Sequence, residues 1–261
     1  MVQPNSKEIA QLKGTSFQKP LEFRIQVDGE SWTQGSVIEG TLEAHNHDTA
    51  PIGPEKFRLF VAHGDLKKVK AARVGGFDAL VPIDLSPEQG TGNGIRSRWK
   101  LQLEPNTPIT DKSGSLFLLY GATEDPISLG HLQLMIEPRQ IYQDYVDILK
   151  TDFRFSERYK KSKKEKVEVK MMPPEGGSAY ATVEQLLVYF SLDGDRLHVQ
   201  YQFSVKEIDA MESGVEIKKR KKTFEQTFGP SEYLLSNGRL KFDHIQAAIQ
   251  KILEQVARTN F

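Results

Sequence analysis

The sequence predicts an all-β fold of two tandem β-sandwiches, with a short connector helix and a C-terminal amphipathic helix. Segments of alternating apolar and polar residues recur in both halves of the chain, separated by Gly, Pro, Asn and Asp. Helical periodicity is confined to two places. The length of 261 residues, with 38% hydrophobic content, allows two domains that each bury a core.

The first sandwich is predicted over residues 21–137, after a loosely held N-terminal arm at 1–20 that is polar and aperiodic. Its first strand alternates apolar and polar side chains, with Leu21, Phe23, Ile25 and Val27 on one face. Six further strands are expected at 37–45, 57–62, 79–85, 99–103, 115–120 and 132–136. Short strands with turn signals between them are typical of a sandwich.

The connector helix is predicted over residues 138–150, where four apolar residues share one helical stripe: Ile141, Tyr145, Ile148 and Leu149. The second sandwich is predicted over 151–235. Its clearest signal is a hairpin in which Asp193-Gly194 separates two alternating strands. The C-terminal helix is predicted over 236–261, with Asp243 as its cap and an apolar stripe formed by Ile245, Ala248, Ile249, Ile252, Leu253 and Val256.

Several kinds of chemistry are excluded or disfavoured. The absence of cysteine excludes disulfides, thiolate nucleophiles and Cys-ligated metals. No Gly-x-Ser-x-Gly nucleophile motif occurs. The glycines of GTGNG at 90–94 precede a predicted strand rather than a helix, which favours a mobile hairpin loop over a nucleotide-binding loop. We therefore predict no catalytic residue, no cofactor and no enzymatic activity.

Charge and hydropathy favour a cytoplasmic protein. The 35 basic residues balance 35 acidic ones, which argues against a protein built to wrap nucleic acid. The first residues lack the apolar core of a signal peptide, and no uninterrupted apolar stretch of about 18 residues occurs.

Three histidines are the candidates for a metal site. His45 and His47 are two residues apart, so they would share one face of a strand, and His63 is a possible third ligand for zinc or iron. Asn46 and the following DTAPIGP indicate a strand end or loop, however. The favoured interpretation is a pair of solvent-facing histidines at a turn, and no metal is predicted.

Two basic runs are the most unusual feature of the sequence. The first comprises Arg158, Lys160, Lys161, Lys163 and Lys164, and the second comprises Lys218, Lys219, Arg220, Lys221 and Lys222. If both runs shared one face or edge, they would attract anionic membrane or nucleic acid. The favoured alternative is that the lysines protect exposed strand edges from pairing with another sheet.

Four segments together resemble the arrestin-like bacterial sporulation-control family. They are LEFRIQVDGESWTQGSVIEGTLEAHN, FRLFVAHG, WKLQLEPNTPITDKSGSLFLLYG and GHLQLMIEPRQ, and the resemblance covers about residues 21–140. It implies two tandem arrestin-like sandwiches that act as a scaffold or adaptor without catalysis. The C-terminal helix and the two histidines near position 46 depart from the family pattern.

The leading hypothesis is a non-catalytic adaptor that binds a protein partner through sheet edges and loops, including the loops near Gly75-Gly76 and at 90–94. The alternative is a peripheral phosphate-binding module that uses the basic runs at 158–166 and 218–222 to contact anionic membrane or nucleic acid. Such binding would weaken steeply as salt rises. The identity of the partner and the oligomeric state stay open.

Overall fold

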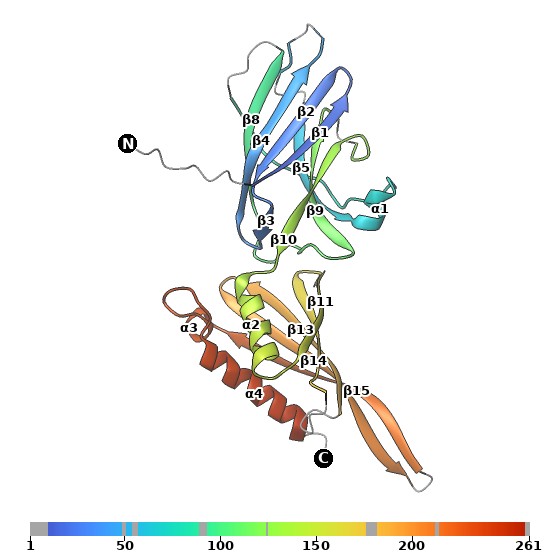
Figure 1. The fold of residues 1–261 in the computed structure, drawn as a ribbon, viewed down its shortest axis with the longest axis vertical. Coiled ribbons are helices and arrows are strands. Elements are labelled where there is room, and N and C mark those ends of the chain that lie inside the picture. Colours follow the sequence, from blue (N-terminus) through green and yellow to red (C-terminus); the bar gives the residue numbers. More distant parts are fainter. Residues whose placement is uncertain are drawn as a thin grey trace. The chain divides into compact units, whose positions relative to one another are not determined.

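The computed structural model describes residues 10–48, 51–53, 57–88, 93–123, 125–175, 182–211 and 214–258. The chain forms two compact units, Met1–Glu137 (unit 1) and Pro138–Phe261 (unit 2). Figure 1 shows strands in both units, with most of the helical residues in unit 2. Among the described residues, no helix is long and apolar enough to cross a membrane.

Unit 1 contains two five-stranded sheets. The first has the order β1-β2-β4-β8-β7 and is formed by β1 (Gln11–Gln18), β2 (Leu21–Asp28), β4 (Val37–Asn46), β8 (Gly94–Gln102) and β7 (Leu85–Pro87). The second has the order β3-β10-β9-β5-β6 and is formed by β3 (Ser31–Thr33), β10 (Gly130–Glu137), β9 (Gly114–Gly121), β5 (Arg58–Asp65) and β6 (Val81–Pro82).

The core of unit 1 lies between these sheets. Alternate residues of β2 and β4 pack against alternate residues of β5, β9 and β10, and include the fully buried Phe23, Leu42, Leu118 and Leu134. Side chains on the outward face of the first sheet are mostly polar. The predicted all-β class and the first sandwich are confirmed, because period-two burial places one apolar face of each sheet inside.

The predicted N-terminal arm is wrong for residues 11–18. This segment forms β1, which pairs with β2 along its whole length, from Gln11↔Asp28 to Gln18↔Leu21. The strand escapes notice in the sequence because its inward positions include Gly14 and Ser16, while Phe17 is 67% exposed. Residues 1–9 of the predicted arm, and 90–92 of the predicted loop, lie outside the described residues.

A short helix, α1 (Leu66–Lys70), and the turn after it cover part of the outer face of the second sheet. Leu66, Val69 and Phe77 pack there against a small apolar cluster that contains Phe117 and Leu119. The sequence offered no helical periodicity for this segment, since it is only five residues long.

Unit 2 is a single antiparallel sheet in which the strands lie in chain order. They are β11 (Ser156–Lys163), β12 (Lys166–Met172), β13 (Val183–Asp193), β14 (Arg196–Met211) and β15 (Gly214–Phe228). Three helices accompany it: α2 (Gln140–Thr151), α3 (Pro230–Tyr233) and α4 (Phe242–Arg258).

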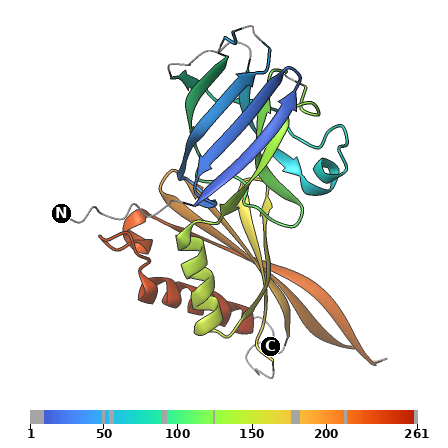
Figure 2. The ribbon, with the colours of Figure 1, turned by 45° about the horizontal axis from the view of Figure 1, so that its top comes forward.

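Unit 2 differs from the predicted second sandwich. Its described residues form one sheet, and α2 and α4 cover the face on which a second sheet was expected (Figure 2). Tyr142 and Tyr145 of α2 pack on Phe190 of β13, while His244 of α4 contacts Phe228 of β15. The alternating strands show that one face of the sheet must be covered, but they do not show what covers it. Here the apolar stripes of the two helices form the covering layer.

A buried polar network fixes both helices to the sheet. The hydroxyls of Tyr145 on α2 and Tyr201 on β14 are hydrogen-bonded to each other. Gln226 of β15 accepts from the Tyr201 hydroxyl at 2.9 Å and donates to the Ala248 carbonyl of α4 at 3.0 Å. Burial raises the pKa of Tyr145 well above 10, so this hydroxyl keeps its proton for the hydrogen bond.

Candidate functional site

The first basic run lies on β11, an edge strand of the unit 2 sheet, and on the turn that follows. Two of its lysines are engaged by a carboxylate of the neighbouring strand. Lys161 Nζ lies 3.1 Å from Glu168 Oε1, and Lys163 Nζ lies 3.2 Å from Glu168 Oε2. The Tyr159 hydroxyl also donates to Glu168 Oε1, at 3.0 Å. These groups form a polar cluster on the face opposite the helices.

The side chain of Glu168 is only 2% exposed, so its ionisation depends on these partners. Burial alone would raise the pKa of Glu168, but hydrogen bonds from Lys161, Tyr159 and Lys163 outweigh it and hold the pKa below 4.5. Lys161 and Lys163 therefore neutralise the buried carboxylate of Glu168. If a ligand took up these two lysines, Glu168 would lose its partners.

The second basic run lies on β15, at the other edge of the same sheet. Lys219 Nζ lies 3.0 Å from Glu184 Oε1, and Lys206 Nζ of β14 lies 3.4 Å from the same oxygen. The hydrogen bonds from these two lysines, that of Lys219 above all, hold the pKa of Glu184 below its ordinary value. Lys218, Arg220 and Lys222 also make interactions within the chain.

The two runs lie at opposite edges of one sheet rather than beside each other. By register, Lys161 and Lys163 share the helix-free face with Lys219 and Lys221, but β11 and β15 are the first and fifth strands. Four strand spacings separate them, roughly 19 Å. On this face, Glu168 lies beside the lysines of the first run and Glu184 lies beside Lys219 of the second run. This geometry favours edge protection over a joint anion-binding surface, and phosphate binding by the runs stays a prediction.

The three candidate histidines are not brought together. His45 ends up on β4 and His47 just after it, whereas His63 lies on β5 in the other sheet, with its Nδ1 3.5 Å from Asp78 Oδ2. The rings of His45 and His47 meet edge to face. Within the described residues, no group of three or more His, Cys, Asp or Glu side chains could hold a metal ion.

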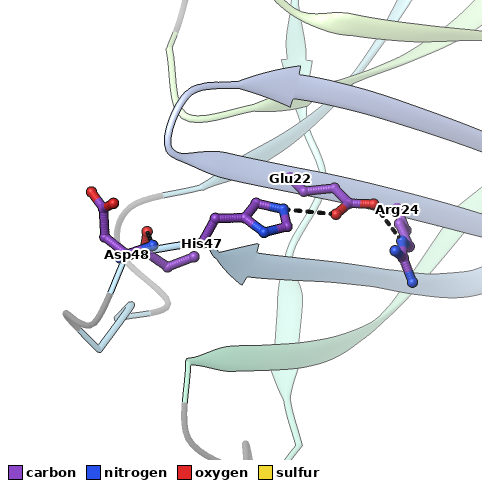
Figure 3. A network of polar contacts seen from close by, with 5 residues as sticks. Glu22, Arg24, His47 and Asp48 are labelled. Atoms are coloured by element: carbon purple, nitrogen blue, oxygen red, sulfur yellow. Dashed lines mark hydrogen bonds and ion pairs between the residues drawn. The ribbon is translucent and has the colours of Figure 1, made fainter.

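His47 instead belongs to a small polar network. Its Nε2 lies 2.9 Å from Glu22 Oε2, and Arg24 Nε donates to Glu22 Oε1 at 2.7 Å (Figure 3). The Arg24 hydrogen bond is the main cause that lowers the pKa of Glu22. The network fastens the end of β4 to β2. This structural role agrees with the interpretation of the histidines as residues at a turn.

The outer edge of β15 is the longest sheet edge in the structure. Along the described backbone, this 15-residue strand pairs with β14 alone. Pairing between β13 and β14 ends at Val183↔Val205, so residues 207–211 and 214–218 continue as a two-stranded ribbon beyond the sheet (Figure 1). Its backbone groups are therefore placed where an incoming strand would pair.

A third group of cations, which the sequence reasoning missed, lies in unit 1. Lys67, Lys68 and Lys70 are exposed on α1, and Arg73 follows in the next turn. Arg73 lines an apolar hollow formed with residues 125–131, and the three lysines lie on the helix whose Val69 also lines it. The spacing Lys-Lys-x-Lys-x-x-Arg after a capping Asp65 was a signal that could have identified them.

No family model matches the chain. Its structure is similar to the crystal structure of Spo0M, a sporulation control protein from Bacillus subtilis, with a TM-score of 0.56 over 94% of this chain and 98% of that chain. The chain shares the fold of this protein. Sequence identity is 13%, so the similarity establishes the fold alone. The resemblance seen in residues 21–140 is confirmed at this level.

Two other similarities are weaker. A segment of 74 residues is 31% identical to the small ribosomal subunit protein uS7 of Streptococcus pneumoniae, but it spans 28% of this chain and 47% of that protein, about half its length. A cycloalternan-forming enzyme from Listeria monocytogenes aligns with 82% of this chain at 9% identity and a TM-score of 0.24, too low to support an inference.

Proposed function

We propose that this protein is a non-catalytic adaptor that binds a protein partner by strand addition at the outer edge of β15. The observation that supports the proposal most directly is the length of that edge, which pairs with β14 alone along its described backbone. The Bacillus subtilis protein of the same fold is a sporulation control protein, which agrees with a regulatory rather than a catalytic role.

Strand addition separates affinity from specificity. Main-chain hydrogen bonds along the edge supply affinity for any extended segment, while side chains at alternate positions select the sequence. Lys219, Arg220 and Lys221 are exposed on this edge strand. A second basic strand is repelled there, whereas an acidic segment is attracted. The same lysines that prevent non-specific pairing therefore restrict the proposed partner to an acidic strand.

The test is site-specific photocrosslinking in the cells that make the protein. A photoreactive amino acid is placed at Lys221 or Thr223, both exposed on β15, and in a control at Lys166, which is exposed on β12 between two other strands. We expect one protein to be crosslinked from both β15 positions and not from Lys166. When the irradiation is repeated in lysate at high salt, the same crosslink should still form, because main-chain pairing is less sensitive to screening than contacts between charges.

Two results would contradict the proposal. One is equal crosslinking from Lys166 and from the β15 positions, which would indicate contact without edge pairing. The other is recovery of lipid or nucleic acid alone, lost at high salt, which would favour the phosphate-binding alternative.

A further inference from the structure

The segment that follows β5 forms a preformed hollow on the outer face of the second sheet of unit 1. Asp65 caps α1 by accepting hydrogen bonds from the backbone N–H groups of Lys67 and Lys68. The Asp65 N–H in turn donates to the Gly76 carbonyl at 2.9 Å, and the Asp78 N–H donates to the His63 carbonyl at 2.8 Å. Both ends of the segment are thus fastened to β5, which fixes the shape of the hollow.

The hollow is apolar and has room for one large side chain. Its volume is about 150 Å³, and its lining includes Val69, Arg73, Val74, Phe77, Ile127 and His131. An apolar cavity of roughly this size in another protein takes up benzene. Val74 is 84% exposed and Ile127 is 56% exposed at its border. Exposed apolar side chains beside an apolar hollow mark a surface that gains free energy when it is covered.

The segment 65–73 beside the hollow carries four cations and one carboxylate, and Arg73 is the cation among them that lines the hollow. Within the described residues, none of the cations Lys67, Lys68, Lys70 and Arg73 forms an ion pair, although Lys67 and Lys68 lie in the field of Asp65. The nearby carboxylates already have donors. Asp65 is held by the N-terminus of α1, Asp78 lies against His63, and Asp125 accepts from the Ser128 hydroxyl at 2.7 Å.

We infer that this hollow binds an acidic peptide segment through one bulky apolar side chain. The apolar side chain would fill the space over Val69 and Phe77, and flanking Asp or Glu residues would face the four cations. This site is separate from β15 and adds a second point of recognition, so the inference does not rest on strand addition. Apolar anchoring with charged flanks gives affinity at the anchor and selectivity at the rim.

An anionic membrane is the competing occupant, because basic residues beside an exposed Val74 also suit a lipid surface. The concave shape favours a peptide. Val74 and Ile127 protrude at the border, but Phe77 lies inside the hollow, with its ring 5.4 Å from Phe117, where only an inserted side chain would reach it. Phe77 is therefore positioned to contact an inserted side chain rather than an acyl layer.

The test uses the full chain and a fluorescein-labelled peptide in which one phenylalanine stands within a run of aspartate and glutamate. Binding is followed by fluorescence anisotropy at low and moderate salt. Replacement of the peptide's phenylalanine by serine should weaken binding about tenfold, the effect of losing one buried aromatic side chain. Ile127→Ser should weaken it in the same direction without unfolding the protein, because Ile127 is on the border.

The cations are tested with the variant K67Q/K68Q/K70Q/R73Q. A matched control, R158Q/K164Q/K166Q/K221Q, removes the same amount of charge from unit 2 and also perturbs the β15 edge. We expect the first variant to weaken peptide binding roughly threefold to tenfold and the control to leave it within about twofold. Because the control changes β15 and leaves α1 intact, peptide binding that survives in the control would separate this inference from the proposed function.

Three results would overturn the inference: no peptide binding, equal binding of the phenylalanine and serine peptides, or equal weakening by the unit 1 and unit 2 variants. Sedimentation with vesicles of phosphatidylcholine and phosphatidylserine tests the competing occupant. Vesicle binding that depends on Lys67, Lys68, Lys70 and Arg73, without binding of the peptide, would assign the surface to membrane contact instead.

Discussion

The two units end their sheets differently. In unit 1, three edge strands, β3, β6 and β7, are only two or three residues long, and the fourth, β1, lies against β9 and β10 of the facing sheet. Gln18 of β1 fastens this seam, because its side chain donates to the Ser128 carbonyl and accepts from the Ala122 N–H. In unit 2, both edge strands are long, with eight residues in β11 and 15 in β15.

This difference shows how each architecture deals with unpaired backbone. A sandwich can shorten or close its edges, whereas a sheet backed by helices keeps both edges open. Unit 2 places basic side chains on those edges and engages several of them with Glu168 and Glu184. Under the proposed function, edge protection and partner selection would depend on the same basic residues of β15.

The largest expected effect tests whether the two units unfold separately. Phe190→Ala removes a fully buried ring that packs against Tyr142 and Tyr145, and should lower the free energy of unfolding of unit 2 by about 3–5 kcal/mol. Phe23→Ala should do the same to unit 1. In calorimetry, each change should shift one transition and leave the other in place. A common shift of both would show that the two units unfold as one.

A smaller effect is expected from the tight fit inside the sandwich. A Cβ at Gly40 would lie closer than van der Waals contact to the Gln26 carbonyl oxygen and to the Trp99 ring. Gly40→Ala should therefore destabilise unit 1 by about 1–3 kcal/mol. Thr41→Ala, on the outward face of the same strand, is the control. It should change the free energy of unfolding, measured by chemical denaturation, by under about 0.5 kcal/mol. Equal effects would show that the strand adjusts freely.

The charge at Glu168 makes the stability of unit 2 depend on pH. Because the pKa of Glu168 is lowered in the folded protein, its ionised form stabilises folding above about pH 4.5, and this contribution is lost as pH falls through the folded pKa. Glu168→Gln should cost about 1–2 kcal/mol at pH 7, discounted because Lys161 and Lys163 are partly exposed.

The measurement is denaturant unfolding of unit 2 between pH 7 and pH 3 for the parent and for Glu168→Gln. The stability difference between them should narrow as pH falls below 4.5 and through the lowered pKa that Glu168 has in the folded protein. The control Glu225→Gln alters an exposed carboxylate of β15. A difference that stays constant with pH would mean that ionisation of Glu168 does not stabilise the fold.

The sequence predicted β2 and β4 because their buried residues alternate with more exposed ones, and it predicted β9 (Gly114–Gly121), at 115–120, because this strand is apolar and buried throughout. The strand predicted at 79–85 is wrong, because this segment contributes only the short β6 and the first residue of β7, which belong to different sheets. In unit 2 the same alternation correctly predicted that one face is buried, but it does not tell whether a sheet or a helix covers that face. The stripe of α4 was also predicted, and Ile245, Ile249 and Leu253 are buried. Asp243, however, lies in the first turn instead of capping the helix.

The candidate site was harder to predict because it depends on contacts between strands. The lysines of β11 are visible in the sequence, but the burial of Glu168 follows from the pairing of β11 with β12, Lys161 opposite Glu168. The hollow beside α1 is formed by two segments about 50 residues apart, around Val74 and Ile127. Neither segment has a periodic pattern, so only the short basic spacing could have indicated it.

The smallest effect on stability is expected from changes to lysines on β15. These changes also test most directly how the edge of the unit 2 sheet is protected. Lys219→Thr with Lys221→Thr removes two charges from the open edge and adds side chains that favour strands. The control, Lys166→Thr with Lys170→Thr, makes the same change on β12, which has strand neighbours on both sides. Both variants should stay within about 1 kcal/mol of the parent in stability, since all four positions retain exposed surface.

The β15 variant and the β12 variant should differ in self-association. Sedimentation velocity over a range of concentrations should reveal dimers or larger species for the β15 variant, because an uncharged edge can pair with that of a second copy. The β12 variant should sediment like the parent, because its backbone groups are already paired. Association of both variants to the same extent would attribute the effect to net charge, and association of neither would mean that ribbon geometry, rather than lysine, keeps the β15 edge from pairing with itself.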